Sequence, residues 1–409
     1  MHILFLSDNF PPEVNAPASR THEHCREWVA AGHQVTVITC APNFPKGRVF
    51  DGYRNALWQC EVIDGIRVVR VWSYITTNVG FLGRFLDYVS FMLAATVASL
   101  CIRKVDVVVG TSPQFFTACA AWMVGGLKRR PWVFELRDLW PESIKAVGAM
   151  KNPTVIGLLE KLELFLYRRA TRIVTVTHSF KRTLGARGID TDKIDVITNG
   201  VDISRFSPRP KDKALMRDLA FEGKFVAGYI GTHGMAHALE TVLQAAQRLK
   251  AMPGGESFQF LFLGDGARKL DLQAQAAQMR LDNVVFVESV PKDEVARYWS
   301  VLDVSIIHLR RTELFTTVIP SKIFECMGMG LPLLHGVAGE SAEIVQREGV
   351  GLVFEPENVH QLVHHLLAMH GDAEARDGYR RSGPQAARRY DRRTLALEML
   401  GILERVRLA

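Results

Sequence analysis

The stretch Thr317-Val-Ile-Pro-Ser-Lys-Ile-Phe-Glu-Cys-Met-Gly-Met-Gly-Leu-Pro332 lies between two apolar runs, at 303–309 and at 331–334. The two runs predict strands, and the stretch between them predicts a loop that turns into a short helix. Pro320 suits a helix start because it has no N–H to leave unbonded, and the Ser321 oxygen can accept from a first-turn N–H.

Gly328 and Gly330 predict the end of this helix. The start of a helix attracts anions, and Lys322 adds a full positive charge there. Glu325 follows about one turn later, where a carboxylate can accept two hydrogen bonds from a vicinal diol. A phosphate site beside a diol site predicts a nucleotide-sugar site. The alternative is that Lys322 and Glu325 form a solvated pair on an ordinary surface helix.

The composition is that of a soluble globular protein, with 48% apolar and 23% charged residues in a chain of 409. This length predicts two domains. The formal charge of +7 fits attraction to phosphates or to an anionic membrane face, and does not by itself indicate nucleic acid. Six scattered cysteines without a C-x-x-C pair indicate buried thiols in a reducing cytosol. The N-terminus predicts a buried strand rather than a signal peptide.

Short β-branched runs alternate with helical patterns in both halves of the chain, which predicts two doubly wound parallel sheets. The turn-rich segment 197–210 separates them, so we predict an N-terminal domain at 1–207 and a C-terminal domain at 208–389. Two such sheets facing one another would form a ligand cleft. The strands are predicted at 2–7, 34–39, 66–72, 105–110, 132–137, 172–177 and 193–197, then at 225–231, 258–263, 283–287, 303–309, 331–334 and 350–354.

The loop after the first strand has no G-x-G-x-x-G, so a dinucleotide-binding fingerprint is absent. Ligands of open α/β sheets bind beyond the carboxyl ends of strands, which makes Asn15, Ala16 and Arg20 candidates for substrate contact. The alternative is a plain loop held by Pro11 and Pro12.

A second charged segment, 134–142, follows another strand, and we expect Arg137 and Asp138 to face the cleft. A structural pair between Arg137 and Glu142 is the alternative there. The glycine loops 231–234 and 264–266 also follow strands, as expected where backbone approaches a ligand closely. No metal site is expected. Asp190-Thr-Asp192 has the spacing of a cation site but lies in a helix-to-strand loop of the first half, and the spaced histidine pairs lack the accompanying acid of a zinc pattern.

The longest uncharged segment, Tyr88 to Ile102, is shorter than the roughly 20 residues that span a bilayer, so it predicts a core helix. A helix face that dips into the bilayer surface is the alternative. That face would combine one arginine with bulky apolar side chains: Arg84, with Phe81, Phe85, Tyr88, Phe91 and Met92.

The chain resembles, over nearly its whole length, the family 4 retaining glycosyltransferases of the GT-B fold, especially the bacterial branch resembling fucosamine transferases of O-antigen and capsule assembly. The order and spacing of several short pieces carry the resemblance. They are Phe10-Pro-Pro-Glu13, Gly32-His33, Glu135-Leu-Arg-Asp-Leu-Trp-Pro-Glu-Ser143, Asn199-Gly-Val-Asp202 with Arg205-Phe206, Gly264-Asp-Gly266, and Pro320-Ser-Lys-Ile-Phe-Glu325 with Gly330-Leu-Pro332.

The resemblance implies that Glu325 holds the ribose, as the second of two family glutamates. The first glutamate falls at Thr317, and a 6-deoxy or acetamido donor sugar would fit that loss. The family arginine and lysine that hold the diphosphate fall at Thr232 and His237, which leaves Lys322 as the replacement.

Other family positions also differ in this chain. Arg268 or Lys269 are possible helpers at the diphosphate. The glycine pair of the first loop falls at Asn15 and Ala16, and a histidine near the reacting centre falls at Arg137.

The expected site therefore has three groups of residues. We expect catalytic roles for Lys322, Asp138 and Arg137; donor binding by Glu325, Thr317, Ser321, Gly231, Thr232, Gly264, Asp265, Gly266 and Arg268; and acceptor binding by Glu13, Asn15, Arg20 and Glu142.

The resemblance implies transfer of a sugar from a UDP-sugar to a polyprenyl-diphosphate-linked saccharide, without metal or cofactor. The enzyme would be cytoplasmic and peripheral at the anionic inner face of the plasma membrane. A C-terminal helix at about 390–409 would pack back on the first domain. The rival interpretations are a nucleotide-sugar epimerase or phosphorylase of the same fold, and a basic phosphate- or membrane-binding module without turnover; nucleic acid is not an expected partner.

Overall fold

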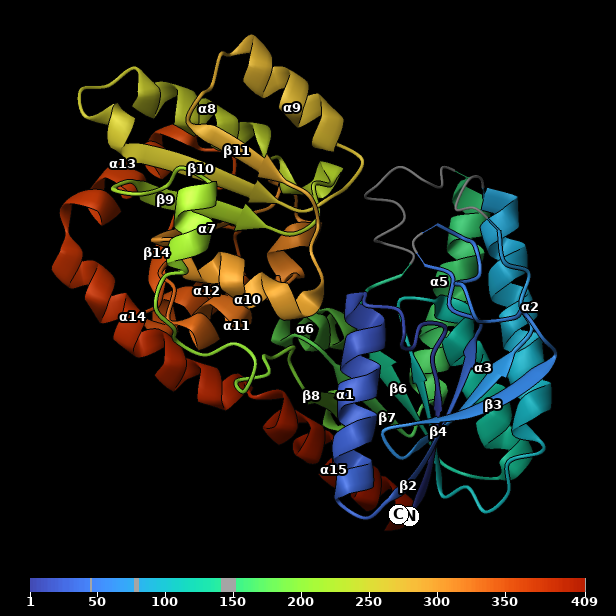
Figure 1. Ribbon diagram of the computed structural model, residues 1–409. Coiled ribbons are helices and arrows are strands. Elements are labelled where there is room, and N and C mark those ends of the chain that lie inside the picture. The colour runs from blue at the N-terminus through green and yellow to red at the C-terminus, as the bar shows by residue number, and fades with distance from the viewer. Residues whose placement is uncertain (45, 77–80, 141–151, 409) are drawn as a thin grey trace. The chain divides into compact units, whose positions relative to one another are not determined.

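The computed structural model describes residues 1–44, 46–76, 81–140 and 152–408 (Figure 1). The chain divides into two compact units. Unit 1 comprises Met1–Thr198 and Arg392–Ala409, and unit 2 comprises Asn199–Asp391. The boundary after Thr198 lies within the predicted linker segment, upstream of the predicted 207/208 boundary.

Unit 1 contains an eight-stranded sheet in the order β3-β4-β2-β1-β5-β6-β7-β8. All neighbours are parallel except β3 and β4. The strands are β1 (His2–Leu6), β2 (Gln34–Cys40), β3 (Trp58–Ile63), β4 (Ile66–Val71), β5 (Val107–Thr111), β6 (Trp132–Leu136), β7 (Arg172–Thr175) and β8 (Ile194–Val196). The predicted parallel sheet is confirmed, apart from the edge strand β3, which the sequence analysis missed.

Helices cover both faces of this sheet, because each central strand is apolar on both sides. In β1, Leu4 and Leu6 belong to the core beneath α2, α3 and α5, whereas Ile3 and Phe5 belong to the core beneath α1 and α15. The helices are α1 (Ala16–Ala30), α2 (Phe81–Ser99), α3 (Phe115–Lys128), α5 (Pro153–Arg169), α6 (His178–Ala186), the 3-10 turn η1 (Thr191–Lys193) and α15 (Arg392–Leu408).

The last helix, α15, packs beside α1 on unit 1 (Figure 1). The Trp28 indole Nε1 of α1 donates to the Ala396 carbonyl oxygen at 2.7 Å. The apolar face of α15 is buried against the same core, through Leu395, Met399, Leu400 and Leu403.

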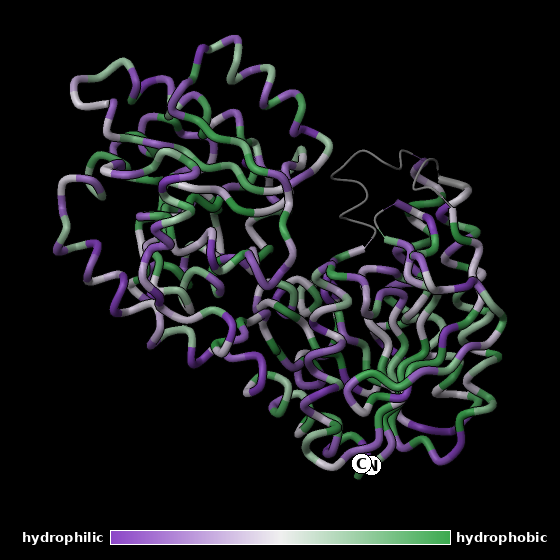
Figure 2. The backbone as a smooth tube through the Cα atoms, viewed as in Figure 1, coloured by the Kyte–Doolittle hydropathy of each residue, from purple (hydrophilic) through white to green (hydrophobic). Residues whose placement is uncertain are grey.

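Unit 2 contains a six-stranded, wholly parallel sheet in the order β11-β10-β9-β12-β13-β14. The strands are β9 (Phe225–Ile230), β10 (Phe258–Leu263), β11 (Val284–Val287), β12 (Val304–His308), β13 (Leu333–Gly336) and β14 (Gly351–Val353). The strands of both units are predominantly hydrophobic (Figure 2). The predicted doubly wound sheet of the second half is confirmed.

The helices of unit 2 also lie on both faces of its sheet, over two apolar cores. They are α7 (Lys213–Asp218), α8 (Glu240–Lys250), α9 (Lys269–Gln278), α10 (Lys292–Ser300), α11 (Lys322–Met329), α12 (Glu340–Glu348), α13 (Val359–Gly371) and α14 (Ala373–Ala387). The 3-10 turns are η2 (Met235–His237), η3 (Gly255–Ser257), η4 (Leu314–Thr317) and η5 (Arg388–Tyr390).

Each sheet changes its direction of winding once. In unit 2 the chain runs outward from β9 through β10 to β11, and then returns to β12 on the other side of β9. In unit 1 the corresponding point lies between β1 and β5. Ligands of open α/β sheets bind beyond the carboxyl ends of strands at such points. The loops after β9 and β1 are therefore the expected locations of a ligand site.

Candidate functional site

The glycine loops after β9 and β10 touch each other in unit 2. The Gly231 N–H donates to the Leu263 carbonyl at 2.8 Å, and the His233 N–H donates to the Asp265 carbonyl at 2.9 Å. A Cβ added to Gly264 would lie 1.9 Å from the Gly231 oxygen. The backbones therefore meet at a distance that only glycine allows. The structure brings Gly231, Gly264 and Gly266 together, as the sequence predicted.

The helix α11 begins at Lys322, next to this pair of loops. Ser321 precedes it with helical backbone angles, and its side chain makes no capping hydrogen bond, so the predicted serine cap is wrong. Gly330 ends the helix in the left-handed conformation at φ +63°. Gly328 does not end it: this residue lies inside the helix, where a Cβ would meet the Phe206 carbonyl oxygen at 2.5 Å.

The Lys322 ammonium is seated on Tyr229. Its Nζ donates to the Tyr229 hydroxyl at 3.1 Å and lies 4.6 Å from the centre of the ring. The tyrosine hydroxyl in turn donates to the Thr232 carbonyl oxygen at 2.8 Å. The positive charge predicted at the helix start thus lies directly over the loop that follows β9.

Two histidines of this loop stay neutral near pH 7. Burial, assisted by the charges of Lys269 and Lys322, lowers the pKa of His233 to about 4. Burial and the charge of Lys322 lower the pKa of His237 to about 4. Thr232 is exposed and uncharged. Thr232 and His237 therefore do not supply the two positive charges that the resemblance implies at these positions.

The two predicted helper cations are paired with acids. The Arg268 Nε lies 3.0 Å from an Asp271 carboxylate oxygen, and the Lys269 Nζ lies 2.6 Å from Glu288 Oε1. Their charges are therefore partly offset. Lys322 forms no ion pair within the described parts of the chain, so its charge is the less compensated one.

Glu325 and Thr317 stand where the resemblance implies two glutamates. The Trp299 indole Nε1 donates to Glu325 Oε2 at 3.3 Å, and Glu325 is half-buried on α11. The Thr317 hydroxyl donates to the Leu314 carbonyl at 2.7 Å, at the end of η4. Thr317 is therefore hydrogen-bonded to its own turn.

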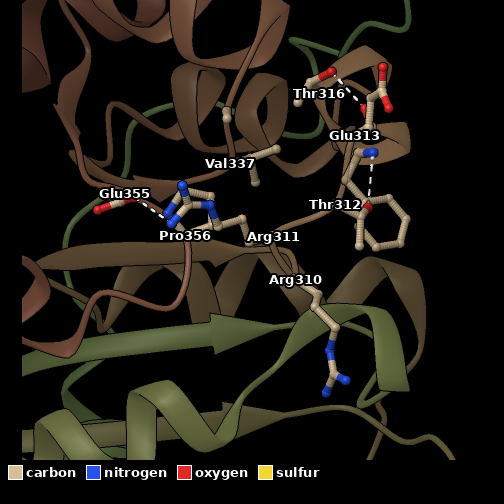
Figure 3. Close-up of a pocket in the computed structure, with 10 residues that line it drawn as sticks. Arg310, Arg311, Thr312, Glu313, Thr316, Val337, Glu355 and Pro356 are labelled. Carbon is tan, nitrogen blue, oxygen red and sulfur yellow. Dashed lines mark hydrogen bonds and ion pairs between the residues drawn. The ribbon is translucent and has the colours of Figure 1, made fainter.

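A pocket of about 460 Å³ lies beyond the carboxyl ends of β12, β13 and β14 (Figure 3). Three of the charged side chains that line it are ion-paired: Arg311 Nη1 lies 2.7 Å from Glu355 Oε1, and Arg310 Nη2 lies 3.1 Å from Oε1 of Glu240, which is outside the lining. The lining reaches Thr316 and includes none of the predicted donor residues. The pocket adjoins the loop after β9, because the Arg310 N–H donates to the Ala236 carbonyl oxygen at 2.7 Å.

Arg20 and Arg137 of unit 1 surround one buried carboxylate, Glu135. Arg20 Nε donates to Glu135 Oε1 at 2.9 Å, and Arg20 also donates to the carbonyls of Ile197 and Thr198 at 2.9 and 2.7 Å. Burial opposes ionisation of Glu135, but the charges of Arg20 and Arg137 lower its pKa to about 2. Arg20 is turned inward, which argues against its predicted contact with an acceptor.

Arg137 lies at the carboxyl end of β6, where its guanidinium donates to the carbonyls of Pro17 and Ala16 at 3.3 and 3.2 Å. The backbone N–H groups of Arg137 and Asp138 both donate to the Ser112 hydroxyl, at 2.7 and 3.2 Å. Arg137 and Asp138 are half-buried. Glu142 lies outside the described residues.

Glu13 and Asn15 also have structural partners. Glu13 Oε1 accepts from the backbone N–H groups of Asn43 and Phe44, each at 2.8 Å, and the residue is only 3% exposed. Asn15 caps α1, because its Oδ1 accepts from the Ala18 N–H at 2.9 Å. Both residues shape the loop after β1, and their acceptor roles stay predictions.

Two acidic residues near this loop, Asp8 and Asp87, were not predicted as part of the site. Burial raises the pKa of Asp8 well above its usual value, and the neighbouring charges of Asp87 and Glu13 raise it further. Burial raises the pKa of Asp87 to about 6. The position of Asp8 directly after β1 was an available signal. No three His, Cys, Asp or Glu side chains among the described residues are grouped to hold a metal ion, and metal independence stays a prediction.

Comparisons with known proteins agree with this architecture. Residues 15–200 match the glycosyl transferase 4-like domain, and residues 224–372 match the glycosyl transferases group 1 domain. WcaI of Escherichia coli K12, whose name assigns it provisionally to colanic acid biosynthesis as a glycosyl transferase, is 26% identical over 89% of this chain and 90% of its own.

Two solved structures share the fold. Sucrose-phosphate synthase from Thermosynechococcus elongatus has a TM-score of 0.76 at 15% identity, over 99% of this chain and 98% of its own. Anabaena Alr3699/HepE, in complex with UDP and glucose, has a TM-score of 0.73 at 16% identity, over 98% of this chain and 99% of its own. With its two successive domain matches, the chain belongs to the family 4 glycosyltransferases of the GT-B fold.

Proposed function

We propose that this glycosyltransferase is a retaining enzyme that moves a sugar from a UDP-sugar to a lipid-linked saccharide during assembly of a cell-surface polysaccharide such as O-antigen, lipopolysaccharide or capsule. The observation that carries the proposal is the Lys322 ammonium held over the glycine loop at the winding switch of unit 2. The similarity to WcaI supports a role in polysaccharide assembly.

In the proposed donor complex, Lys322 and the glycine loops bind the diphosphate and Glu325 binds the ribose diol. A carboxylate and an ammonium are suited to these two groups, because both form charge-assisted hydrogen bonds. The UDP bound by HepE supports uridine as the nucleoside of the donor. Thr317 offers no carboxylate to sugar hydroxyls, which favours a 6-deoxy or acetamido sugar.

The proposed reaction needs no metal. The bond between the sugar C1 and the β-phosphate oxygen breaks, and the acceptor oxygen bonds to C1 on the same face. The leaving phosphate oxygen takes the acceptor proton. Lys322 stabilises the charge that develops on the leaving UDP, and one preorganised donor of this kind contributes about 2.7 to 4 kcal/mol. Arg137 and Asp138 are assigned to the acceptor or to the reacting sugar.

We further propose that unit 1 meets the lipid acceptor at an anionic membrane surface on the cytoplasmic side. The predicted membrane-facing side of α2 needs correction, because Phe91 is fully buried and Tyr88 and Met92 pack against the core. Phe85 of the predicted side is exposed, and the other exposed apolar side chains of α2 are Leu86, Leu93 and Val97. No described helix has the length and apolar character to cross a bilayer.

Exposed basic residues follow the helices on this side of unit 1. Arg103 and Lys104 come after α2, and Arg129 and Arg130 come after α3, which packs against α2. An apolar stripe with basic neighbours is suited to an anionic lipid surface. It would place the enzyme where a polyprenyl-linked acceptor is found.

Calorimetry with UDP, GDP and dTDP, followed by transfer assays with a panel of UDP-sugars and a lipid-linked acceptor, tests the proposal. We expect UDP to bind and labelled sugar to appear on the lipid. Epimerised sugar or sugar phosphate as the product would indicate an epimerase or a phosphorylase instead. Salt-sensitive vesicle binding without any turnover would indicate a binding module.

A further inference from the structure

We infer that Tyr229 is a positioning residue, which fixes the Lys322 ammonium over Gly231 before the donor binds. The inference rests on the proposed role of Lys322 at the leaving diphosphate. Tyr229 acts through the lysine and has no assigned contact with the substrate.

The Tyr229 hydroxyl has one available arrangement of its hydrogen bonds. An ammonium group donates only, so the phenol oxygen must accept from Lys322 Nζ at 3.1 Å. The hydroxyl proton is then directed to the Thr232 carbonyl at 2.8 Å. Tyr229 is 1% exposed and lies in β9, so the group that receives the ammonium is anchored in the sheet.

The ring of Tyr229 provides a second contact to the same ammonium. Lys322 Nζ lies 4.6 Å from the ring centre, within the range of a cation–π interaction. The side chains of His233 and His237 pack against this tyrosine, with ring centres 5.9 and 5.8 Å away. Both are neutral near pH 7, because burial lowers the pKa of each to about 4. Neither histidine therefore competes with the lysine as a cation.

Gly231 lies on another side of the Lys322 side chain and, with Tyr229, forms the binding position of the ammonium, which we call the seat of the lysine. A Cβ at this position would lie 2.1 Å from Lys322 Cε and 2.2 Å from Nζ, so the side chain occupies the space that any other residue would need. The φ angle of +144° also favours glycine here. Strand β9 and the loop after it thus fix the position of the ammonium that the start of α11 carries. A charge fixed in advance stabilises a transition state without reorganisation.

The test is Tyr229→Phe, which keeps the ring and removes the hydroxyl. We expect kcat for the best UDP-sugar to fall about 10- to 100-fold, the rate equivalent of one hydrogen bond to a charged group, with the KM for the acceptor unchanged. Tyr379→Phe is the matched control, because Tyr379 lies on α14, outside the seat of the lysine, and its variant should keep full activity. A Tyr229→Phe enzyme with wild-type kcat would overturn the inference.

A double-mutant cycle separates positioning from general structural support. If Tyr229 acts through the lysine, Tyr229→Phe should have no further effect on kcat in a Lys322→Ala background. An equal loss in both backgrounds would refute the positioning role. A Lys322→Ala enzyme with unchanged kcat would instead refute the proposed role of the lysine, so the two failures are distinguishable.

Gly231→Ala provides an independent variant. The added methyl group should displace the ammonium and lower kcat about as much as Lys322→Ala does. Thermal melting of each variant checks folding, and a well-folded Gly231→Ala enzyme with wild-type turnover would also contradict the inference.

Discussion

Arg20 of α1 and Glu135 of β6 form a buried ion pair, with Nε and Oε1 2.9 Å apart and side-chain exposures of 7% and 1%. The pair ties a helix to a strand far away in the sequence, and Arg20 also binds the carbonyls that follow β8. Glu135 also interacts electrostatically with Arg137, which lies at the carboxyl end of β6. One carboxylate thereby stabilises the side of unit 1 where an acceptor contact is proposed.

Removing the Glu135 charge should destabilise unit 1 strongly. Glu135→Gln leaves the buried guanidinium of Arg20 and the half-buried one of Arg137 without their counter-charge, and breaking a buried pair such as Arg20–Glu135 costs about 3 to 5 kcal/mol of unfolding free energy. Urea denaturation measures the loss. Asp282→Asn, which removes an exposed partner of Lys250, should leave the midpoint unchanged. Equal midpoints for Glu135→Gln and the wild type would contradict the structural role.

The ionisation of Glu135 also predicts a loss of unfolding free energy at acidic pH. The pKa of Glu135 is lowered from 4.5 to about 2 in the folded protein, so its contribution is fully present above pH 4.5 and is lost as the pH falls from 4.5 to 2. Wild-type unfolding free energy should decrease through this window. Glu135→Gln should show a shallower decrease there, and parallel curves would count against the assignment.

The buried histidines of unit 2 predict a loss of stability at higher pH than this. Burial lowers the pKa of His233 and His237 from 6.5 to about 4, so the unfolded state binds more protons between these values. Unfolding free energy should therefore fall as the pH drops from 6.5 to 4. His233→Phe suits the test, because His233 lies among Phe262, Phe286 and Tyr229. This variant should reduce the pH dependence, and an unchanged slope would exclude His233 as its source.

Lys322→Ala should lower kcat by about 10²- to 10³-fold, since it removes a preorganised charge at the leaving diphosphate. Steady-state transfer assays measure the effect. Lys250→Ala is the control, because Lys250 lies at the end of α8 in an ion pair with Asp282. A decrease of less than threefold would argue against the leaving-group role.

Glu325→Ala should weaken UDP binding by about 1.5 to 3 kcal/mol, the value of lost hydrogen bonds to a charged group. Titration calorimetry gives the change in Kd, and Glu343→Ala on the exposed side of α12 is the control. A UDP titration identical to that of the wild type would refute the ribose assignment.

The sequence predicted the parallel strands well, because most of them are short apolar runs, and central strands such as β1, β5 and β9 are buried on both sides. It missed β3, whose alternate residues are exposed and half-buried. The signal was present in Asp64-Gly65, which joins β3 to β4 with φ angles of +47° and +78°, as in a tight hairpin turn. The periodicity of a half-exposed edge strand is weaker than the continuous apolar pattern of a buried strand.

The candidate site was predictable in its backbone and less so in its side chains. Gly231, Gly264 and Lys322 converge as expected, because glycine loops and a helix start occupy fixed places at strand ends. The partners of Lys322 were not predictable, since Tyr229 reads as an ordinary strand residue. The buried position of Arg20 was not predictable either, because the sequence around Glu135 does not reveal that this carboxylate pairs with a distant arginine.

The return of α15 to unit 1 affects the order in which the protein can be completed during synthesis. Unit 1 is built from the first 198 residues and from the segment that begins at Arg392. While the ribosome is still translating unit 2, Trp28 lacks the Ala396 carbonyl that its indole binds, and the core behind α1 lacks its last apolar cover. The nascent chain therefore carries an incomplete hydrophobic core in unit 1 until α15 emerges, and a premature stop in α15 would impair the unit that was translated first.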